Sequence, residues 1–256
     1  MFKIAIIQFP RNSDDLTCNL QLMTSYFEKI APDTDLVLLP EGWLGSQPLK
    51  MHTYQTILQD LFHLLKAPDC LLVSGAQYVE VNNQNLCRGL ILSRELLNPV
   101  PFDKLFPSEA IGERNFIAPG DQLPVVKHKD WFIGVAVCVD LFYPEVIRSL
   151  ALRGASLILN PATIPTNRIP LWKTLGEVRA CENTVFVAMA NNTDTTYPDG
   201  RKIMGDSYVA YPDGYNFFNY GANPGIYYAE LELSLIDKAR IRWPYLEDVR
   251  NRQPLY

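Results

Sequence analysis

The segment of residues 131–145 reads WFIGVAVCVDLFYPE and joins two elements of different character. Its first part, residues 131–137, is an apolar run rich in β-branched side chains, which is typical of a buried strand. Pro144 follows closely and is favoured in the first turn of a helix. A buried strand that leads directly into a helix indicates an α/β fold, with Cys138 at the point where the chain turns.

Cys138 therefore occupies a position at which α/β proteins often place a nucleophile. The end of a buried strand is rigid, and the backbone N–H groups beyond it are unpaired. A lone cysteine is more often a small buried hydrophobic residue. The choice between these interpretations depends on what the rest of the chain supplies.

Buried strands alternate with amphipathic helices along most of the chain. Residues 3–8 and 36–39 are continuous apolar strands, and apolar residues between them recur at helical spacing up to about residue 31. This β-α-β order predicts neighbouring strands covered by helices. Further strands are predicted at residues 70–79, 86–93, 157–160, 185–190, 207–210 and 226–231, and further helices at residues 54–65, 144–153 and 171–182.

The composition bounds the class of protein. With 48% hydrophobic and 20% charged residues, the 256-residue chain is expected to form a globular protein with a sizeable core. A net charge of -5 without a basic cluster gives no reason to expect nucleic acid as a partner. No apolar run approaches the roughly 18 residues of a membrane helix, and no signal peptide precedes the first strand, so no membrane partner is expected either.

No linker or composition break divides the chain. We therefore predict a single domain over residues 1–256, with residues 241–256, which are rich in Arg, Trp, Tyr and Pro, as a C-terminal tail or arm. The cysteines are scattered, without a C-x-x-C pair, and the three histidines lie far apart, so neither a zinc site nor a disulfide framework is predicted. This cysteine usage predicts a cytoplasmic location.

Two further polar residues attract attention because of their surroundings. Glu41 directly follows the apolar strand at residues 36–39, where a carboxylate either caps the next turn or acts in catalysis. Lys104 lies in a long segment, residues 99–124, whose aromatic and aliphatic content favours a packed loop that lines a site over disorder.

Glu41, Lys104 and Cys138, in this order, resemble the nitrilase (carbon–nitrogen hydrolase) superfamily. The contexts that carry the resemblance are Leu39-Pro40-Glu41, Asp103-Lys104-Leu105-Phe106 and Gly134-x-x-x-Cys138-x-Asp140-x-x-x-Pro144-Glu145. Further matches are Arg148 through Ala155, Asn160-Pro161-Ala162, Arg179-Ala180-x-Glu182-Asn183 and Gly205-x-Ser207. The resemblance extends from residue 3 to about residue 231.

The resemblance implies a four-layer α-β-β-α sandwich with two mixed β-sheets and a reaction without metal or organic cofactor. Cys138 would be the nucleophile, Glu41 the general base, and Lys104 the cation that stabilises the oxyanion. The family carries a second glutamate after the lysine, for which Glu113 is the nearest match and Glu109 the alternative. It also implies a homodimer or larger assembly, in which the helices after Pro144 and Pro170 meet.

Residues around the nucleophile favour a substrate class. Nitrile-hydrolysing members tend to carry Trp-Glu after the cysteine, whereas Val139-Asp140 here points to a small amide or N-carbamoyl substrate. The backbone N–H of Val139 would be the second oxyanion donor, and Tyr143 and Thr163 are candidates for contact with substrate. Other pocket candidates are Arg114, Arg168 and Trp172. Each of these residues, like Tyr143 and Thr163, could instead have a structural or surface role.

Three alternatives to an amidase remain at this point. A nitrile hydrolase of the same family and a catalytically silent scaffold protein both stay open, although the presence of all three triad residues argues against the scaffold. A papain-like cysteine hydrolase is disfavoured, because no histidine lies in a suitable context. The four cysteines other than Cys138 (Cys18, Cys70, Cys87 and Cys181) are expected to be replaceable with activity retained.

Overall fold

The computed structural model describes residues 1–12 and 15–252. Its helices are α1 (Leu16–Phe27), α2 (Met51–His63), α3 (Pro144–Leu152), α4 (Ile169–Asn183), α5 (Leu233–Arg242) and α6 (Tyr245–Asn251), with short 3-10 helices η1 (Glu109–Ile111), η2 (Glu113–Asn115), η3 (Cys138–Phe142) and η4 (Thr166–Arg168). Within these described ranges, no helix combines the length and the apolar character that crossing a bilayer requires.

Two mixed sheets carry the fold. The strands are β1 (Phe2–Pro10), β2 (Leu36–Leu38), β3 (Leu49–Lys50), β4 (Leu71–Val81), β5 (Gln84–Leu92), β6 (Val100–Asp103), β7 (Val125–His128), β8 (Trp131–Val135), β9 (Leu157–Ala162), β10 (Phe186–Thr193), β11 (Thr195–Thr196), β12 (Lys202–Ile203), β13 (Tyr208–Ala210), β14 (Phe217–Asn219) and β15 (Gly225–Leu231). The first sheet has the order β6-β5-β4-β2-β1-β15, with β3 beside β4, and the second has the order β7-β8-β9-β10-β13-β14. A short parallel pairing of β1 with β10 joins them at one end.

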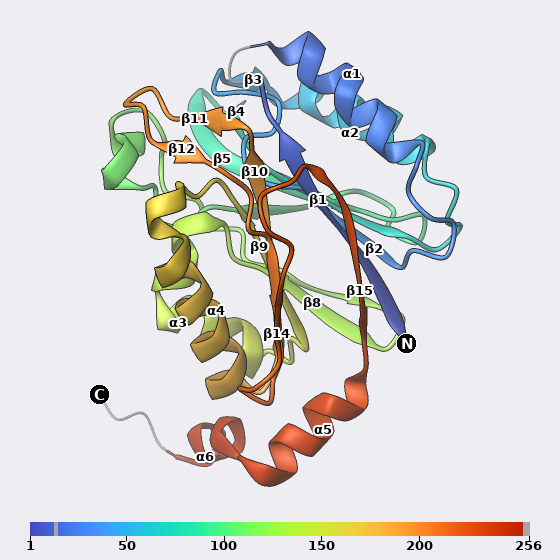
Figure 1. Cartoon of the computed structure of the whole chain (residues 1–256), viewed down its shortest axis with the longest axis vertical. Coiled ribbons are helices and arrows are strands. Elements are labelled where there is room, and N and C mark those ends of the chain that lie inside the picture. The colour runs from blue at the N-terminus through green and yellow to red at the C-terminus, as the bar shows by residue number, and fades with distance from the viewer. Residues whose placement is uncertain (13–14, 253–256) are drawn as a thin grey trace.

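Helices cover the outer faces of both sheets. Figure 1 shows α1 and α2 on one side of the molecule and α3 and α4 on the other, with the strands between them. Alternation along β1 explains the layers: Ile4 and Ile6 belong to the core shared with the second sheet, whereas Ala5 and Ile7 pack in the core beneath α1 and α2. The predicted four-layer α-β-β-α sandwich is confirmed.

Local turn chemistry accounts for the hairpin of β4 and β5. Asn82 and Asn83 both adopt positive φ values, 50° and 64°. Two successive residues of this kind form the turn type whose twist matches that of paired strands, and asparagine tolerates it better than most residues. The pairing then places Tyr78 opposite Cys87, a register that becomes important at the site.

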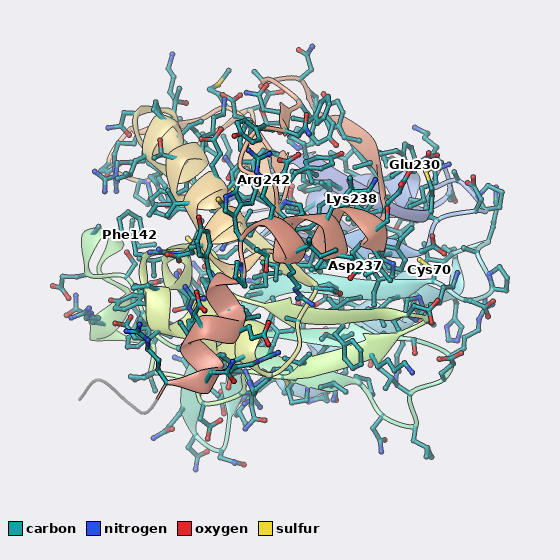
Figure 2. The ribbon with its side chains drawn as sticks, turned by 90° about the horizontal axis from the view of Figure 1, so that it is seen from below. Cys70, Phe142, Glu230, Asp237, Lys238 and Arg242 are labelled. Atoms are coloured by element: carbon teal, nitrogen blue, oxygen red, sulfur yellow. The ribbon has the colours of Figure 1, made fainter. Side chains whose placement is uncertain are left out.

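The C-terminal segment differs from the tail or arm that its composition predicted. Residues 245–251 form α6, whose Leu246 is buried in the main core, and the Arg250 guanidinium donates to the carbonyl of Leu152 at 3.2 Å. Figure 2 shows α5, with Asp237, Lys238 and Arg242 labelled on it, running across the end of the sheets toward α6. One apolar side chain anchors this helix, which is too weak a pattern to recognise in sequence, and residues 253–256 lie outside the described residues.

A close backbone approach fixes the strand end that carries Glu41. Gly75 in β4 has φ +68°, and a Cβ added to it would lie 2.0 Å from the carbonyl oxygen of Pro40. The next residue of β4, Ala76, accepts a hydrogen bond from the N–H of Gly42 at 2.7 Å. The chain on both sides of Glu41 is therefore held against β4.

We expect Gly75→Ala to lower the free energy of unfolding by about 2–5 kcal/mol, because it combines left-handed strain with a clash against backbone. Gly154→Ala is the matched control, since Gly154 also has positive φ (+100°) but nothing within 4 Å of an added Cβ. Urea denaturation of the two variants measures the difference. Equal losses of stability in both would show that the approach to Pro40 is unimportant.

Candidate active site

Glu41 reaches the site from the loop after β2, and its backbone is tied to the second sheet. Its N–H donates to the carbonyl of Ala162 at 3.3 Å. Its carbonyl accepts from the Thr163 hydroxyl and from the Asn192 side-chain amide, each at 2.7 Å. Because both backbone groups of Glu41 are hydrogen-bonded, the position from which its buried side chain extends is fixed.

Lys104 lies just beyond β6 and is completely buried. Its ammonium donates to Oε1 of Glu41 at 2.9 Å and to Oε1 of Glu113 at 2.8 Å. Burial alone would lower the pKa of Lys104, but the Glu41 carboxylate, the Cys138 sulfur and the Glu113 carboxylate outweigh it and raise the pKa well above its ordinary value. The side chain is therefore a permanent cation within the site.

Glu113 and Glu109 are both candidates for the second glutamate, and the structure separates them. Glu113 is buried in η2, where its carboxylate accepts from the Tyr78 hydroxyl at 2.8 Å and from the N–H of Ser108 at 2.5 Å. The side chain of Glu109 is 74% exposed and faces Arg114 at 3.7 Å. Glu113 is thus the glutamate placed beside the Lys104 ammonium.

Cys138 is the first residue of η3 and adopts φ +48°, a left-handed conformation that is unfavourable for a residue with a side chain. The side-chain amide of Asn160 holds this backbone by donating to the carbonyls of Ala136 at 2.6 Å and of Cys138 at 3.1 Å. Backbone strain of this kind gathers at functional sites, where the surrounding structure maintains it. The N–H of Val139 follows in the first turn of η3, where donors have no partner within the helix.

Opposing charges act on the Cys138 thiol. Burial and the Glu41 carboxylate raise its pKa well above the ordinary value, while the Lys104 ammonium and a hydrogen bond from the backbone of Thr163 act in the other direction. The resting sulfur is therefore a thiol and needs a base when it reacts. The charges that act on the pKa of this thiol are thus those of Glu41, Lys104 and Glu113.

Asp140 links η3 to the segment that carries Lys104. Its carboxylate oxygens accept from the N–H groups of Leu105 at 2.9 Å and Phe106 at 3.0 Å. Burial raises the pKa of Asp140 to about 7, although these two hydrogen bonds lower it in part. The aspartate two residues after Cys138 thus fixes the position of the lysine.

A cavity of about 870 Å³ lies over Glu41. Tyr78 and Phe116 line it, as do Tyr197 and Arg201 of the hairpin formed by β11 and β12. The Arg201 guanidinium donates to the carbonyl of Ala110 at 3.5 Å, so the hairpin and η1 meet at the edge of the cavity. In Figure 1 this hairpin lies beside the green segment that contains η1.

The residues predicted to contact substrate have different positions. Thr163 lines the cavity, but its hydroxyl already donates to the Glu41 carbonyl. Tyr143 is not in the cavity wall, because its ring stacks on Phe106 with centroids 3.8 Å apart. Val139 is also outside the wall, which leaves only its backbone N–H for a role at the site. Arg114, Arg168 and Trp172 are outside it too.

Sequence reasoning missed the cavity wall formed by the turn at residues 197–200. Tyr-Pro-Asp-Gly predicts a tight turn, and the N–H of Gly200 does donate to the carbonyl of Tyr197 at 2.9 Å. The Tyr197 hydroxyl, however, donates to the Thr163 carbonyl, and its ring lines the cavity. The only available signal was an aromatic residue, followed by Asp199 and Arg201, in a short polar turn.

Ligand atoms of Glu41, Cys87 and Glu113 lie within 4.8 Å of one another, which is a spacing that a metal ion would accept. The Lys104 ammonium contacts both carboxylates of this group. A protein cation therefore already lies between these carboxylates and offsets one of their two negative charges.

Comparisons with known proteins agree with this geometry. The carbon-nitrogen hydrolase family model matches residues 3–241. An (R)-stereoselective amidase from Pseudomonas sp is 28% identical over 261 residues, covering 97% of this chain and 91% of that protein. The omega-amidase NIT3 of Saccharomyces cerevisiae is 27% identical over 274 residues, covering 97% and 93%.

Solved structures show the same fold. The XC1258 protein of Xanthomonas campestris, a CN-hydrolase superfamily protein, superposes with a TM-score of 0.86 at 21% identity, covering 100% of this chain and 98% of that one. The family model matches nearly the whole chain, and the two relatives named above are amidases. The chain therefore belongs to the carbon-nitrogen hydrolase family, as an amidase-like member of the nitrilase superfamily.

Proposed function

We propose that this hydrolase cleaves a small amide or N-carbamoyl substrate through a thioester on Cys138 and releases ammonia or an amine. The observation that carries the proposal is the buried Lys104 ammonium, held between Glu41 and Glu113, because the charges of all three act on the pKa of the Cys138 thiol. A nucleophile, a base and a fixed cation are the groups that acyl transfer from nitrogen requires.

In the first half of the reaction, Glu41 takes the proton of Cys138 as the sulfur bonds to the carbonyl carbon. The carbonyl π electrons move to oxygen, where the Lys104 ammonium and the Val139 N–H would stabilise the negative charge. Loss of such a donor costs about 3–4 kcal/mol in other enzymes. Glu41 then gives its proton to the leaving nitrogen as the C–N bond breaks, which leaves a thioester.

Water completes the cycle. Glu41 accepts a proton from a water molecule as the water oxygen attacks the thioester carbon. The C–S bond then breaks as the acid product forms. The proton returns to the Cys138 sulfur. General acid–base help of this kind contributes about 10²–10⁴-fold, and Glu113 would keep Lys104 in place throughout.

Substrate size and class follow from the surroundings of the site. A cavity of about 870 Å³ is within the range of ordinary small-molecule pockets. The names of the relatives, an (R)-stereoselective amidase and an omega-amidase, support an amide over a nitrile for this chain. Nitrile hydrolysis stays as the second candidate within the same chemistry.

We expect ammonia release from members of a panel of small amides and N-carbamoyl amino acids, and little from nitriles. Cys138→Ala should abolish this release without unfolding the protein, because one small side chain replaces another. Cys181→Ser is the matched control and should retain activity, since Cys181 lies in α4 with its sulfur against Gly214. Wild-type turnover by Cys138→Ala would overturn the assignment of the nucleophile.

Lys104→Met should lower kcat at least about 10²-fold, because it keeps the stem and loses the charge. It should also lower the free energy of unfolding at pH 8 by about 3–5 kcal/mol, because Glu41 and Glu113 are left as buried carboxylates without their cation. The loss should shrink toward pH 5, since protonation of a carboxylate removes the uncompensated charge.

The double variant Lys104→Met with Glu113→Gln is the matched control for stability. It should regain part of the lost stability and remain inactive, as followed by urea denaturation at both pH values and by ammonia release. Activity in either variant near that of the wild type would exclude an essential role for the ammonium.

Assembly is the second part of the proposal. On α4, the apolar residues Leu171 and Val178 are 38% and 45% exposed. They lie seven residues apart and so on one face of the helix. We propose that α3 and α4 pack against their counterparts in a second copy across a twofold axis, which uses the same surface on both subunits.

Light scattering at micromolar concentration should give the mass of a dimer or of a multiple of it. Leu171→Glu combined with Val178→Glu should shift the mass to that of a monomer, because the charges would be buried without partners. Leu97→Glu, at a fully exposed leucine elsewhere, should leave the mass unchanged. A monomeric wild-type protein would contradict this assembly.

We also propose a cytoplasmic location. All five cysteines are free thiols, and Cys70, Cys87 and Cys138 are buried. A reducing compartment preserves such thiols.

A further inference from the structure

Cys87 is a second thiol within the candidate active site, and the reaction proposed above does not use it. It lies in β5, is buried, and its thiol donates to Oε1 of Glu41 at 3.6 Å. From sequence alone it was expected to be replaceable. Its contact with Glu41, the proposed general base, distinguishes Cys87 from Cys18, Cys70 and Cys181.

Backbone pairing places Cys87 between the charged residues of the site. Its carbonyl accepts the N–H of Lys104 at 2.8 Å, while its side chain points to Glu41. Its partner across the hairpin is Tyr78, whose hydroxyl donates to Glu113. Two facing residues of β4 and β5 therefore each hold one of the two carboxylates that flank the ammonium.

The two oxygens of the Glu41 carboxylate have unequal surroundings. Oε1 accepts both the Lys104 ammonium at 2.9 Å and the Cys87 thiol at 3.6 Å. Among the described residues, no hydrogen bond ends on Oε2. Because a carboxylate oxygen has two lone pairs, two donors leave Oε1 with little capacity for a proton, whereas Oε2 is open.

We propose that Cys87 is a positioning residue: its thiol and the Lys104 ammonium together occupy Oε1 of Glu41, and so leave Oε2 as the oxygen that exchanges a proton with Cys138. The inference rests on the proposed function, in which Glu41 is the base. Cys87 itself stays protonated, because burial and the nearby Glu41 carboxylate raise its pKa well above the ordinary value. It is thus a donor and not a second nucleophile.

Several titratable or charged groups besides Cys87 surround Glu41. They face it from the other elements around the site, and each stays in place in the variants below. The titratable and charged groups that act on Glu41 or share its cavity are Lys104, Glu113, Cys138, Tyr78, Tyr197, Arg11, Asp199 and Arg201.

The test follows alkylation of the whole protein by iodoacetamide as a function of pH, with peptide mass spectrometry to identify the modified thiol. This probe needs no knowledge of the substrate and reports proton transfer from Cys138 directly. Wild-type protein should be alkylated at Cys138, with a rate that falls on the acid side as the base becomes protonated.

Cys87→Ala should move this acid limb to higher pH by about 0.5 unit or more, because losing a donor disfavours the ionised carboxylate. The alkylation rate at pH 6 should fall roughly 3- to 10-fold, which is the range expected for one hydrogen bond. Cys87→Ser keeps a donor and should restore the wild-type profile. Cys70→Ala removes an equally buried thiol away from the site and should change nothing.

An unchanged acid limb in Cys87→Ala, or a Cys87→Ser profile equal to that of Cys87→Ala, would overturn the positioning role while leaving the proposed function intact. Alkylation of Cys87 ahead of Cys138 in wild-type protein would also overturn it. If Cys87→Ala does not fold, Cys87→Val, which removes the donor but keeps a side chain of similar size, takes its place with the same expected shift. Failure to alkylate Cys138 at all would reject the proposed function itself, which distinguishes the two failures.

Discussion

A fully buried ammonium between two carboxylates is the interaction on which the site depends. Glu41 comes from the loop after β2, Lys104 and Glu113 come from the segment between β6 and β7, and none of the three would be stable in the interior alone. Together they carry one net negative charge, which the Tyr78 hydroxyl and the Ser108 N–H help to stabilise through Glu113. The cost of burying these charges is offset only when all of them are in place, so the fold must deliver them together.

Hydrogen bonds to the backbone hold these residues in position. Asn192 holds the carbonyl of Glu41, Asn160 holds the carbonyl of Cys138, and Asp140 holds the N–H groups that follow Lys104. Each of these polar side chains is buried in the structure. The hydrogen bonds that these side chains make fix the backbone of the candidate catalytic residues, while the side-chain oxygens of Asn160 and Asn192 have no partner among the described residues.

The cavity brings together segments with no local relation to one another. The hairpin of β11 and β12 follows the second sheet, whereas η1 and η2 belong to the segment after β6 of the first sheet. Their meeting at Arg201 and Ala110 encloses space above Glu41 that neither segment could form by itself. In such an arrangement the loops would set specificity, while the candidate catalytic residues Glu41, Lys104 and Cys138 follow the ends of rigid strands.

The sequence by itself determined the alternation of strands and helices, because periodic burial is written in consecutive residues. Its resemblance to a known family implied the four-layer class and made Glu41, Lys104 and Cys138 the candidate catalytic residues. Only the tertiary structure decided between Glu113 and Glu109, removed Tyr143 from the cavity wall and placed Cys87 against Glu41. Those facts depend on strand register and loop packing between distant residues. The Asn82-Asn83 turn sets the register that pairs Tyr78 with Cys87, but no local pattern shows that the carboxylates of Glu113 and Glu41 lie against these two side chains.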